Sequence, residues 1–512
     1  MNIGSMLPRH ARYRPDHTAV VCEDSRLTFR DFNVRVNRLA NALSSLNVRK
    51  GDKVATVLRN CLSLLETYWA VAKIGAVVVP LSPLLRESAL ATLIQDSDTG
   101  TIIASLDFAE PLAALKPELR NVPEKRFILT GSTRVPRFQH YDELTAQASG
   151  GEPDAVDIVD SDPYNIMYSS GTTGAPKGIV KTHSIRALYC TTFASNFRMT
   201  PESVVLHVGS LVFNGAFITL MPAMYLGATY VLHNSFDPQT FVETVEREHV
   251  THVMMVPSQI VALIRSPHFS VDALKSLEML GTVGGPFHLE YKKELIRSLP
   301  GRFYELYGLT EGFATVLDKN HPQSKLNSVG VPQPFSEMRI INEQGQDLAS
   351  GEIGEIVGRG PFLMPGYYKR PDLTAQAIVD GWLHTGDLGY VDEDGFLYLV
   401  DRKKDLITSG GTNVFPKDIE EIIVQHPAVR EAAVFGIPHE RWGETPLAAV
   451  ILNSGDSVTA EALRDWTNER VMAKYQRVHA VVIMEEFPRS TAGKTLKRLL
   501  REPYWSGRST KI

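Results

Sequence analysis

The sequence predicts an α/β protein with a large N-terminal domain and a small C-terminal domain, and three observations lead to this fold class. The chain has 512 residues, which exceeds the roughly 100–200 residues typical of one domain. Strand-like and helix-like segments alternate over about the first 300 residues, a pattern typical of mainly parallel sheets covered by helices. From about residue 329, short strands separated by glycines predict a barrel-like β subdomain.

Hydrophobic spacing supports each of these elements in chain order. Apolar residues recur at helical spacing over 28–46, and Asp237-Pro238 is typical of a helix start. Short apolar runs predict buried strands in the first part and Gly-punctuated strands in the second. The predicted strands are 53–58, 75–79, 204–207, 228–232, 252–256, 338–341, 354–357 and 396–399.

A polar segment divides the chain into two units. Residues 401–405 read DRKKD and have no apolar anchor, so we expect an N-terminal domain over 1–400 and a hinge over 401–405. A small α+β domain over 406–512 follows, which we expect to move as a lid. It has a helix that begins at Pro416 and strands at 432–437, 448–452 and 478–483.

Composition excludes several classes of function. Lysine and arginine number 53 against 58 acidic residues, a net charge of −5, so nucleic acid is not expected as a partner. Three cysteines lie far apart without metal-ligand spacing, which favours a reducing compartment. We find neither a signal peptide nor a transmembrane segment, and we expect a cytoplasmic enzyme. A homo-oligomer is possible.

The segment YSSGTTGAPKG at 168–178 has the composition of a phosphate-binding loop. Its glycines let backbone N–H groups converge on an anion, its hydroxyls add donors, and Lys177 adds a positive charge. A P-loop is excluded, because Pro176 stands where the second glycine is required and Gly178 stands where Ser or Thr is required.

This segment resembles the phosphate loop of the acyl-adenylate-forming superfamily, which includes acyl-CoA synthetases, peptide-synthetase adenylation domains and luciferases. Four further segments resemble the family in order and spacing, so the resemblance covers essentially the whole chain. They are YGLTE at 307–311, WLHTGDLG at 382–389, DRKKDLITSGG at 401–411 and PRSTAGK at 488–494.

The resemblance implies ATP, Mg²⁺ and coenzyme A as cofactors, and each implied contact suits its residue chemically. Tyr307 offers a ring for adenine, Thr310 a hydroxyl for the α-phosphate, and Glu311 a carboxylate for Mg²⁺. Asp387 and Arg402 suit the ribose. The phosphates would contact the loop residues Ser169, Ser170, Gly171, Thr172, Thr173 and Gly174, with Thr173 also near the metal.

Two lysines and a hinge complete the implied machinery. Lys177 and Lys494 would neutralise charge around the attacking carboxylate and the nucleotide, as catalytic residues beside Thr310 and Glu311. The resemblance places the pivot of domain rotation at Lys404 and the path of coenzyme A at Gly411.

The acyl site is the least specified part. Phe213 and Asn214 occupy the segment where many relatives carry a gating residue, and Gly284 and Gly285, with Gly281 before them, leave a wall without side chains. We therefore expect an apolar fatty or aryl acid as the substrate of an AMP-forming acid:CoA ligase.

Three other hypotheses stay open at this point. The enzyme could load a separate carrier protein, or it could be a luciferase-like oxygenase. A non-catalytic relative that senses ATP or acyl-adenylate is the third, although Lys177, Glu311 and Lys494 are all present.

Overall fold

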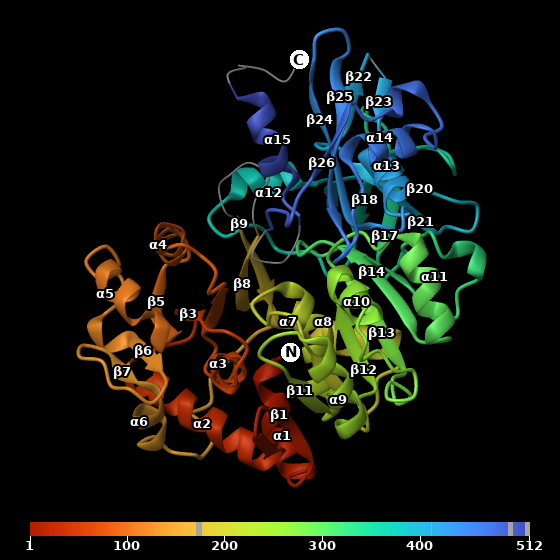
Figure 1. Cartoon of the computed structure of the whole chain (residues 1–512). Helices are drawn as coiled ribbons and strands as arrows, with labels where there is room; N and C mark the ends of the chain where they lie inside the picture. The colour runs from red at the N-terminus through yellow and green to blue at the C-terminus, as the bar shows by residue number, and fades with distance from the viewer. Residues whose placement is uncertain (170–176, 411, 490–494, 507–512) are drawn as a thin grey trace.

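Two large sheets with helices between them and outside them form the N-terminal domain of the computed structural model (Figure 1). The structure describes residues 1–169, 177–410, 412–489 and 495–506. The layers run helix, sheet, helix, sheet, helix, and the predicted α/β architecture with a separate small C-terminal domain is confirmed.

The first sheet has the strand order β7-β6-β5-β3-β4-β8-β9. All its neighbouring strands are parallel except β8 and β9, which form an antiparallel hairpin. Its strands are β3 (Lys53–Val57), β4 (Val77–Leu81), β5 (Thr99–Ser105), β6 (Phe127–Thr130), β7 (Gln139–His140), β8 (Pro163–Ser169) and β9 (Lys177–Thr182).

The second sheet has the order β16-β15-β14-β13-β12-β10-β11-β1-β2. Its central strands from β14 to β1 are parallel, and the strands at both edges are antiparallel. The strands are β1 (Thr18–Cys22), β2 (Ser25–Thr28), β10 (Val204–His207), β11 (Thr229–Leu232), β12 (His252–Met255), β13 (Met279–Val283), β14 (Phe303–Gly308), β15 (Ala314–Leu317) and β16 (Val331–Pro332).

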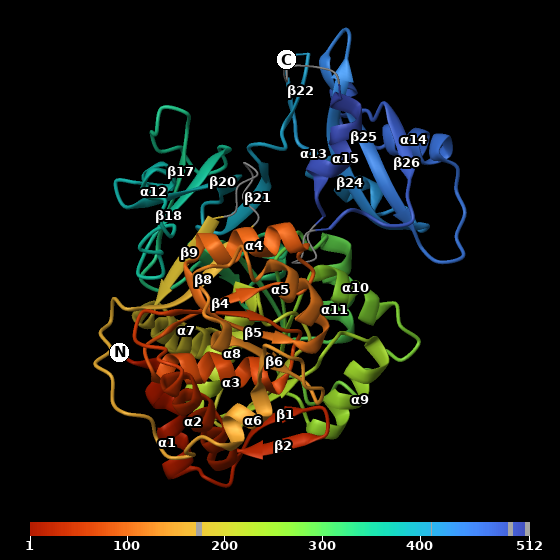
Figure 2. The ribbon, with the colours of Figure 1, turned by 90° about the vertical axis from the view of Figure 1, so that its left-hand side faces the viewer.

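The helices between the two sheets carry the main core. Alternate side chains of both sheets join these helices in one apolar cluster, and the views in Figures 1 and 2 agree that α7 and α8 lie between the sheets. Helix α8 is almost wholly apolar, as expected of a helix buried on all sides. The helices are α1 (Met6–Tyr13), α2 (Phe29–Ser45), α3 (Leu62–Lys73), α6 (Tyr141–Ala146), α7 (His183–Asn196) and α8 (Asn214–Leu226).

Amphipathic helices cover the two outer faces. On the second sheet, α9 begins at the predicted Asp237, whose side chain accepts a hydrogen bond from the Thr240 amide and so caps the helix. The helices on this sheet are α9 (Pro238–Glu248), α10 (Pro257–Ile264) and α11 (Leu289–Ser298), and those on the first sheet are α4 (Glu87–Asp96) and α5 (Ala109–Leu115).

A five-stranded antiparallel sheet follows, as the short strands separated by glycines from about residue 329 predict. Strand β20 pairs with three others, and β18 pairs with β17 at the edge. The elements are β17 (Glu337–Ile341), β18 (Gly354–Arg359), α12 (Pro371–Ala377), β19 (Ile378–Val379), β20 (Trp382–Val391) and β21 (Leu397–Arg402).

The C-terminal domain is a mixed sheet with helices on both faces. Helices α13 and α14 pack on one apolar cluster, and α15 packs on another across the sheet. The elements are β22 (Ile407–Ser409), β23 (Thr412–Val414), α13 (Pro416–Ile423), β24 (Val429–His439), β25 (Gly443–Leu452), α14 (Ala460–Asn468), β26 (Ala480–Ile483) and α15 (Lys497–Trp505).

In the described ranges, five short 3₁₀ turns connect these elements. They are η1 (Ile3–Ser5), η2 (Leu106–Phe108), η3 (Glu124–Arg126), η4 (Gln323–Lys325) and η5 (Lys474–Gln476). None of the helices in the described ranges combines the length and apolar content that a membrane crossing requires.

Polar contacts join the C-terminal domain to α11 and to β21. His288 Nδ1 lies 2.9 Å from a Glu421 carboxylate oxygen, and the Tyr291 hydroxyl donates to the Arg430 carbonyl at 3.3 Å. The Lys417 side chain donates to the Leu399 carbonyl at 2.7 Å. These contacts hold the small domain in the orientation seen here.

Asp401 lies where β21 leads into this interface. Its carboxylate accepts hydrogen bonds from the backbone amides of Arg402 (2.7 Å) and Lys417 (3.1 Å). Burial raises the pKa of Asp401 to about 6, against the opposing charge of Lys497. The folded protein therefore binds this proton more tightly than the unfolded chain, so the contribution of Asp401 to stability decreases as the pH rises from about 4 to about 6.

We predict that Asp401→Asn raises the melting temperature at pH 8 by roughly 1–3 °C, because it removes a buried charge. The gain should shrink toward pH 4, where the native carboxyl is already protonated. Thermal melts from pH 4 to pH 8 test this, with the exposed Asp456→Asn as control. A gain of equal size at both ends of this range would contradict the assignment.

Candidate active site

The candidate site lies where the central strands of the second sheet end. Strands β12, β13 and β14 are parallel neighbours in register, so the loops that follow them meet at one edge of the sheet. Ligands bind at this edge in open α/β sheets. The loop after β14 carries Thr310 and Glu311, and the loop after β13 carries Gly284 and Gly285.

A tyrosine, an aspartate and an arginine form one end of this site. The Tyr307 hydroxyl donates to Asp387 Oδ2 at 2.8 Å, and Arg402 Nε lies 3.3 Å from Asp387 Oδ1. Burial and the adjacent carboxylate raise the pKa of Tyr307 well above its ordinary value, so its hydroxyl stays protonated and donates. The structure therefore brings together three residues predicted to contact adenosine.

Backbone geometry fixes Asp387 in this position. Gly386 has a φ of +70°, a left-handed conformation that favours glycine, and the Asp387 amide bonds the Thr385 hydroxyl at 3.1 Å. Asp387 also pairs with Arg402 across β20 and β21. The TGD triplet is thus a turn that delivers a nearly buried carboxylate beside an arginine.

Lys177 and Glu311 meet at one tyrosine. The Tyr367 hydroxyl donates to Glu311 Oε1 at 2.8 Å, and Lys177 Nζ lies 5.1 Å from the centre of the Tyr367 ring. Burial and the Glu311 carboxylate raise the pKa of Tyr367, which keeps the hydroxyl a donor. Tyr367 is a functional candidate that the sequence analysis missed.

The backbone around Tyr367 links both sheets. Tyr367 forms a bridge with Ile179 of β9, and the Met364 amide donates to the Glu311 carbonyl at 2.7 Å. Gly312 has a φ of +128°, and a Cβ there would lie 2.0 Å from the Phe362 carbonyl oxygen, so only glycine fits. The Gly-Tyr-Tyr run at 366–368 was the available signal, but it matches no general catalytic pattern.

The four predicted acyl-site residues lie near one another. Phe213 is the N-cap of α8 and Asn214 its first residue, and both are half-buried. A Cβ on Gly215 would contact Val283 at 3.7 Å, next to Gly284, which has a φ of +95°. Cβ atoms on Gly284 and Gly285 would meet nothing closer than 3.8 Å, so these glycines leave free space.

Gly281 has a different role from the pocket wall suggested by its neighbours. It lies inside β13, where a Cβ would come within 2.5 Å of Met279 and 2.8 Å of Met254. Its small size therefore permits packing of the core between the sheets.

Several predicted site residues lie outside the described residues. These are Ser170, Gly171, Thr172, Thr173, Gly174, Gly411 and Lys494. Ser169 is placed by its backbone, which pairs with Lys177 at the end of the β8–β9 hairpin. Its pairing partner Lys177 is the residue that lies over the Tyr367 ring.

The predicted hinge, residues 401–405, begins within β21 and includes Arg402. Strand β21 continues to Arg402, two residues into the segment 401–405, because it pairs there with Asp387. Burial lowers the pKa of Lys404, with Asp405 as the largest opposing charge. Beyond the turn, Gly410 has a φ of +58°, and a Cβ there would lie 2.9 Å from the Trp442 ring.

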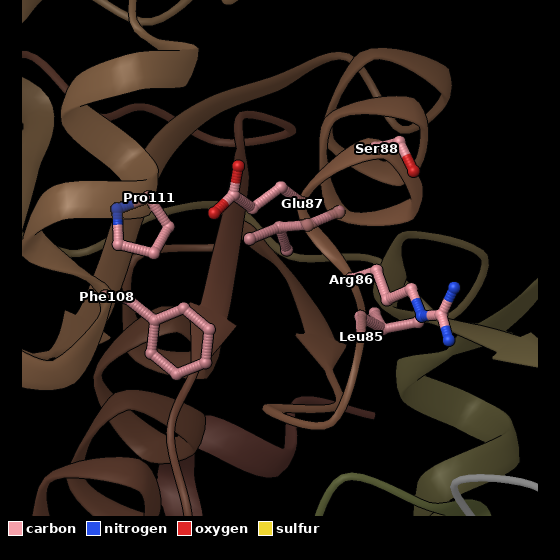
Figure 3. Close-up of a pocket in the computed structure, with 7 residues that line it drawn as sticks. Leu85, Arg86, Glu87, Ser88, Phe108 and Pro111 are labelled. Atoms are coloured by element: carbon pink, nitrogen blue, oxygen red, sulfur yellow. The ribbon is translucent and has the colours of Figure 1, made fainter.

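A pocket of about 580 Å³ elsewhere on the first sheet contains none of the predicted residues. Figure 3 shows it between the start of α4 and the turn before α5, with Phe108 and Pro111 on one side and Arg86 extending away from them. It is lined by Leu85, Arg86, Glu87, Ser88, Leu90, Phe108 and Pro111.

Comparisons with known proteins identify the family of the chain. A family model for AMP-binding enzyme matches residues 7–368, and one for AMP-binding enzyme C-terminal domain matches 418–494. The chain is 34% identical to a feruloyl-CoA synthase of an Amycolatopsis species, covering 98% of this chain and 99% of that protein. It is 30% identical to a long-chain-fatty-acid–CoA ligase of Bacillus subtilis, covering 97% and 94%.

A solved structure gives a similar result. The o-succinylbenzoate CoA synthetase of Bacillus subtilis, in complex with its acyl-adenylate intermediate, is 29% identical and has a TM-score of 0.85. The match covers 97% of each chain.

We predict that Tyr367→Phe slows acid-dependent pyrophosphate release by roughly tenfold, because Glu311 loses the donor that orients its carboxylate. The Mg²⁺ concentration for half-maximal rate should rise as well. Tyr368→Phe is the matched control, since the Tyr368 hydroxyl donates to Asp98 instead, at 2.8 Å. An unchanged Mg²⁺ dependence in Tyr367→Phe would remove Tyr367 from this role.

Proposed function

Because the chain belongs to the AMP-binding enzyme family and is an AMP-forming acyl-CoA synthetase, we propose that it activates an aromatic carboxylic acid and transfers the acyl group to coenzyme A. The observation that supports this choice is the combination of aromatic rings with a hydroxyl next to the amide of Asn214, a residue of the predicted acyl site. Tyr189 lies 5.8 Å from Phe362 between ring centres, and Asn214 Nδ2 donates to the Tyr189 hydroxyl at 3.3 Å.

The first half-reaction joins the acid to AMP. A carboxylate oxygen attacks the α-phosphorus of ATP, the bond to the β-phosphate oxygen breaks, and pyrophosphate leaves. A carboxylate needs no general base, so the residues have to align two anions and balance the charge on the phosphate oxygens. In the second half-reaction the coenzyme A thiol loses its proton, attacks the acyl carbonyl, and AMP leaves.

The adenosine of ATP would lie against Tyr307, with its ribose hydroxyls on Asp387 and Arg402. Asp387 has two oxygens that already accept from Tyr307 and face Arg402, so a ribose hydroxyl could donate to the same carboxylate. The phosphates would contact the loop 169–174, the Lys177 ammonium and the Thr310 hydroxyl.

Glu311 is the residue that would hold Mg²⁺, with the Thr173 hydroxyl on the phosphate side. The Tyr367 hydroxyl occupies only Oε1 of Glu311, which leaves the second oxygen for the ion. No group of three or more His, Cys, Asp or Glu in the described part of the chain could hold a metal ion. A single carboxylate suits Mg²⁺ that binds mainly through substrate phosphates and water, where it neutralises charge on the leaving pyrophosphate.

A fatty acid is the second candidate. Helix α8 is apolar on all sides, and the relative from Bacillus subtilis is named for long-chain fatty acids. The aromatic acid is preferred because the polar pair Asn214 and Tyr189 has no function in binding an alkyl chain. Feruloyl-CoA synthase, the relative at 34% identity, is named for an aromatic acid.

The C-terminal domain would act as a lid that turns between the half-reactions. Lys494 would serve adenylation and Gly411 would border the path of coenzyme A, with rotation about Lys404. The polar contacts of His288, Tyr291 and Lys417 with their partners can exchange with water, which supports an interface that opens. The three cysteines Cys22, Cys61 and Cys190 are free thiols, which fits a cytoplasmic enzyme.

A panel of acids tests the proposed function. We expect pyrophosphate release with ATP and Mg²⁺ to depend on an aromatic acid such as cinnamate or 4-hydroxycinnamate, with acyl-CoA formed only when coenzyme A is added. Product mass identifies the thioester. Turnover with octanoate and other alkyl acids alone would establish the fatty-acid candidate, and accumulation of acyl-adenylate without thioester would indicate a carrier protein as acceptor.

Two substitutions test whether Lys494 and Gly411 of the C-terminal domain serve different half-reactions. We predict that Lys494→Ala lowers the adenylation rate by roughly 10²–10³, because it removes a charge aimed at the transition state. The same variant should still convert added acyl-adenylate to acyl-CoA. Gly411→Leu is the reciprocal variant, which should keep adenylation and lose thioester formation. Equal damage to both half-reactions in either variant would refute the assignment of Lys494 to adenylation and Gly411 to thioester formation.

A further inference from the structure

Arg186 is a guanidinium buried at the centre of the molecule. It lies on α7, between the two large sheets, and its exposed fraction is 0%. Its charged group lies 4.1 Å from the centre of the Phe217 ring and 4.8 Å from that of Tyr189. A charge in such surroundings costs stability unless an opposite charge accompanies it.

Among the described residues, the hydrogen-bond partners of Arg186 are neutral. Its Nε and Nη2 donate to Asn165 Oδ1, both at 3.2 Å, and its Nη1 donates to Asn214 Oδ1 at 2.9 Å. No carboxylate of the described residues forms an ion pair with it, and the segments outside them, 170–176, 411, 490–494 and 507–512, contain no Asp or Glu.

Other buried cations of the chain have a carboxylate partner or a lowered pKa. Lys73 pairs with Glu152 at 2.6 Å, and Lys292 forms an ion pair with Glu305. Lys181, the neighbour of Arg186 in the core, donates to the Phe362 carbonyl at 3.0 Å. Burial and the charge of Arg186 hold the pKa of Lys181 well below its ordinary value. Arg186 is therefore unusual as a permanent buried charge without a carboxylate.

The guanidinium fixes the direction of two amide groups. Arginine can only donate, so the oxygens of Asn165 and Asn214 must face it and their NH₂ groups must face away. The NH₂ group of Asn165 is buried without a partner. The NH₂ group of Asn214 uses one hydrogen toward the Tyr189 hydroxyl, which leaves its second hydrogen free to donate.

Asn214 connects this buried network to the acyl site. It is the half-buried first residue of α8, beside Gly215 and the loop of Val283 and Gly284. The Tyr189 ring, which Asn214 also contacts, packs against the Phe362 ring. The Phe362 carbonyl group in turn lies against Gly312, the residue after Glu311. Asn214 therefore stands between the buried guanidinium and the proposed acyl site.

We propose that Arg186 is a specificity-determining positioning residue that holds the Asn214 amide as a hydrogen-bond donor toward an oxygen substituent on the ring of the aromatic substrate. This inference rests on the proposed function and deepens it. A ring hydroxyl or methoxy oxygen accepts from Asn214, and the nearby positive charge favours such an electron-rich group. An acid that lacks this oxygen leaves the amide hydrogen unpaired, which disfavours its binding.

The test compares two acids that differ by one oxygen. Pyrophosphate release is measured with 4-hydroxycinnamate and cinnamate, and kcat/KM should favour the hydroxylated acid by about tenfold or more in the native enzyme. Arg186→Met should bring this ratio close to one, mainly through a higher KM for 4-hydroxycinnamate. Arg186→Lys keeps a donor for one amide and should retain part of the preference.

Two further measurements separate positioning from a structural role. Arg198→Met, in the turn just after α7, is the matched control, because Arg198 pairs with Asp318 at 2.7 Å and not with Asn165 or Asn214, and the ratio should stay native. Arg186→Met should melt at the same temperature as the native protein or higher, since it removes a buried charge without an opposite charge. Asn214→Leu tests the donor itself and should also bring the ratio close to one.

The outcomes are distinct. A native preference that persists in both Arg186→Met and Asn214→Leu overturns the inference, as does equal loss on both acids with a lower melting temperature. Absence of any preference in the native enzyme overturns it as well, while the proposed function stands. If octanoate is a substrate and neither aromatic acid is, the proposed function itself fails.

Discussion

The common end of β12, β13 and β14 is the constraint on which the rest of the site depends. Because these strands are parallel and in register, residues separated by some fifty positions in the chain reach the same edge of one sheet. The hairpin of β8 and β9 approaches from the other sheet, and the segment around Tyr367 connects the two. A site assembled in this way needs both sheets in a fixed relation, which the apolar helices between them provide.

Tyrosine hydroxyls orient the carboxylates around this edge. The Tyr307 hydroxyl donates a hydrogen bond to Asp387, and the Tyr367 hydroxyl donates one to Glu311. Farther out, the Tyr168 hydroxyl donates to Asp96 and the Tyr368 hydroxyl to Asp98. All four oxygen–oxygen distances lie between 2.6 and 2.8 Å. A protonated tyrosine fixes the direction of a carboxylate without cancelling its charge, whereas a lysine or arginine would neutralise it. The charge on Glu311 thus stays available for a ligand, whereas Asp387 also forms an ion pair with Arg402.

Sequence patterns predicted those features that depend on local chemistry. The period of apolar residues located α2, and the Asp-Pro pair located the start of α9, because capping and amphipathicity act within a few residues. The predicted set Tyr307, Asp387 and Arg402 does come together. Tyr367 and Arg186 could not be found in this way, because their importance arises from partners more than twenty positions away that only the fold brings near. Gly281 shows the opposite case, a residue in a suggestive glycine cluster that the sheet uses for packing.

The pairing of β21 with β20 has a mechanical consequence. Arg402 is the last residue of β21 and is held against Asp387, while the turn at Lys403 and Lys404 begins with the next residue. In the proposed rotation about Lys404, the C-terminal domain would turn while β21, which carries Arg402, stays paired with β20. A nucleotide bound at Asp387 and Arg402, as proposed, would then keep its place while the C-terminal domain presents different residues to the acyl group.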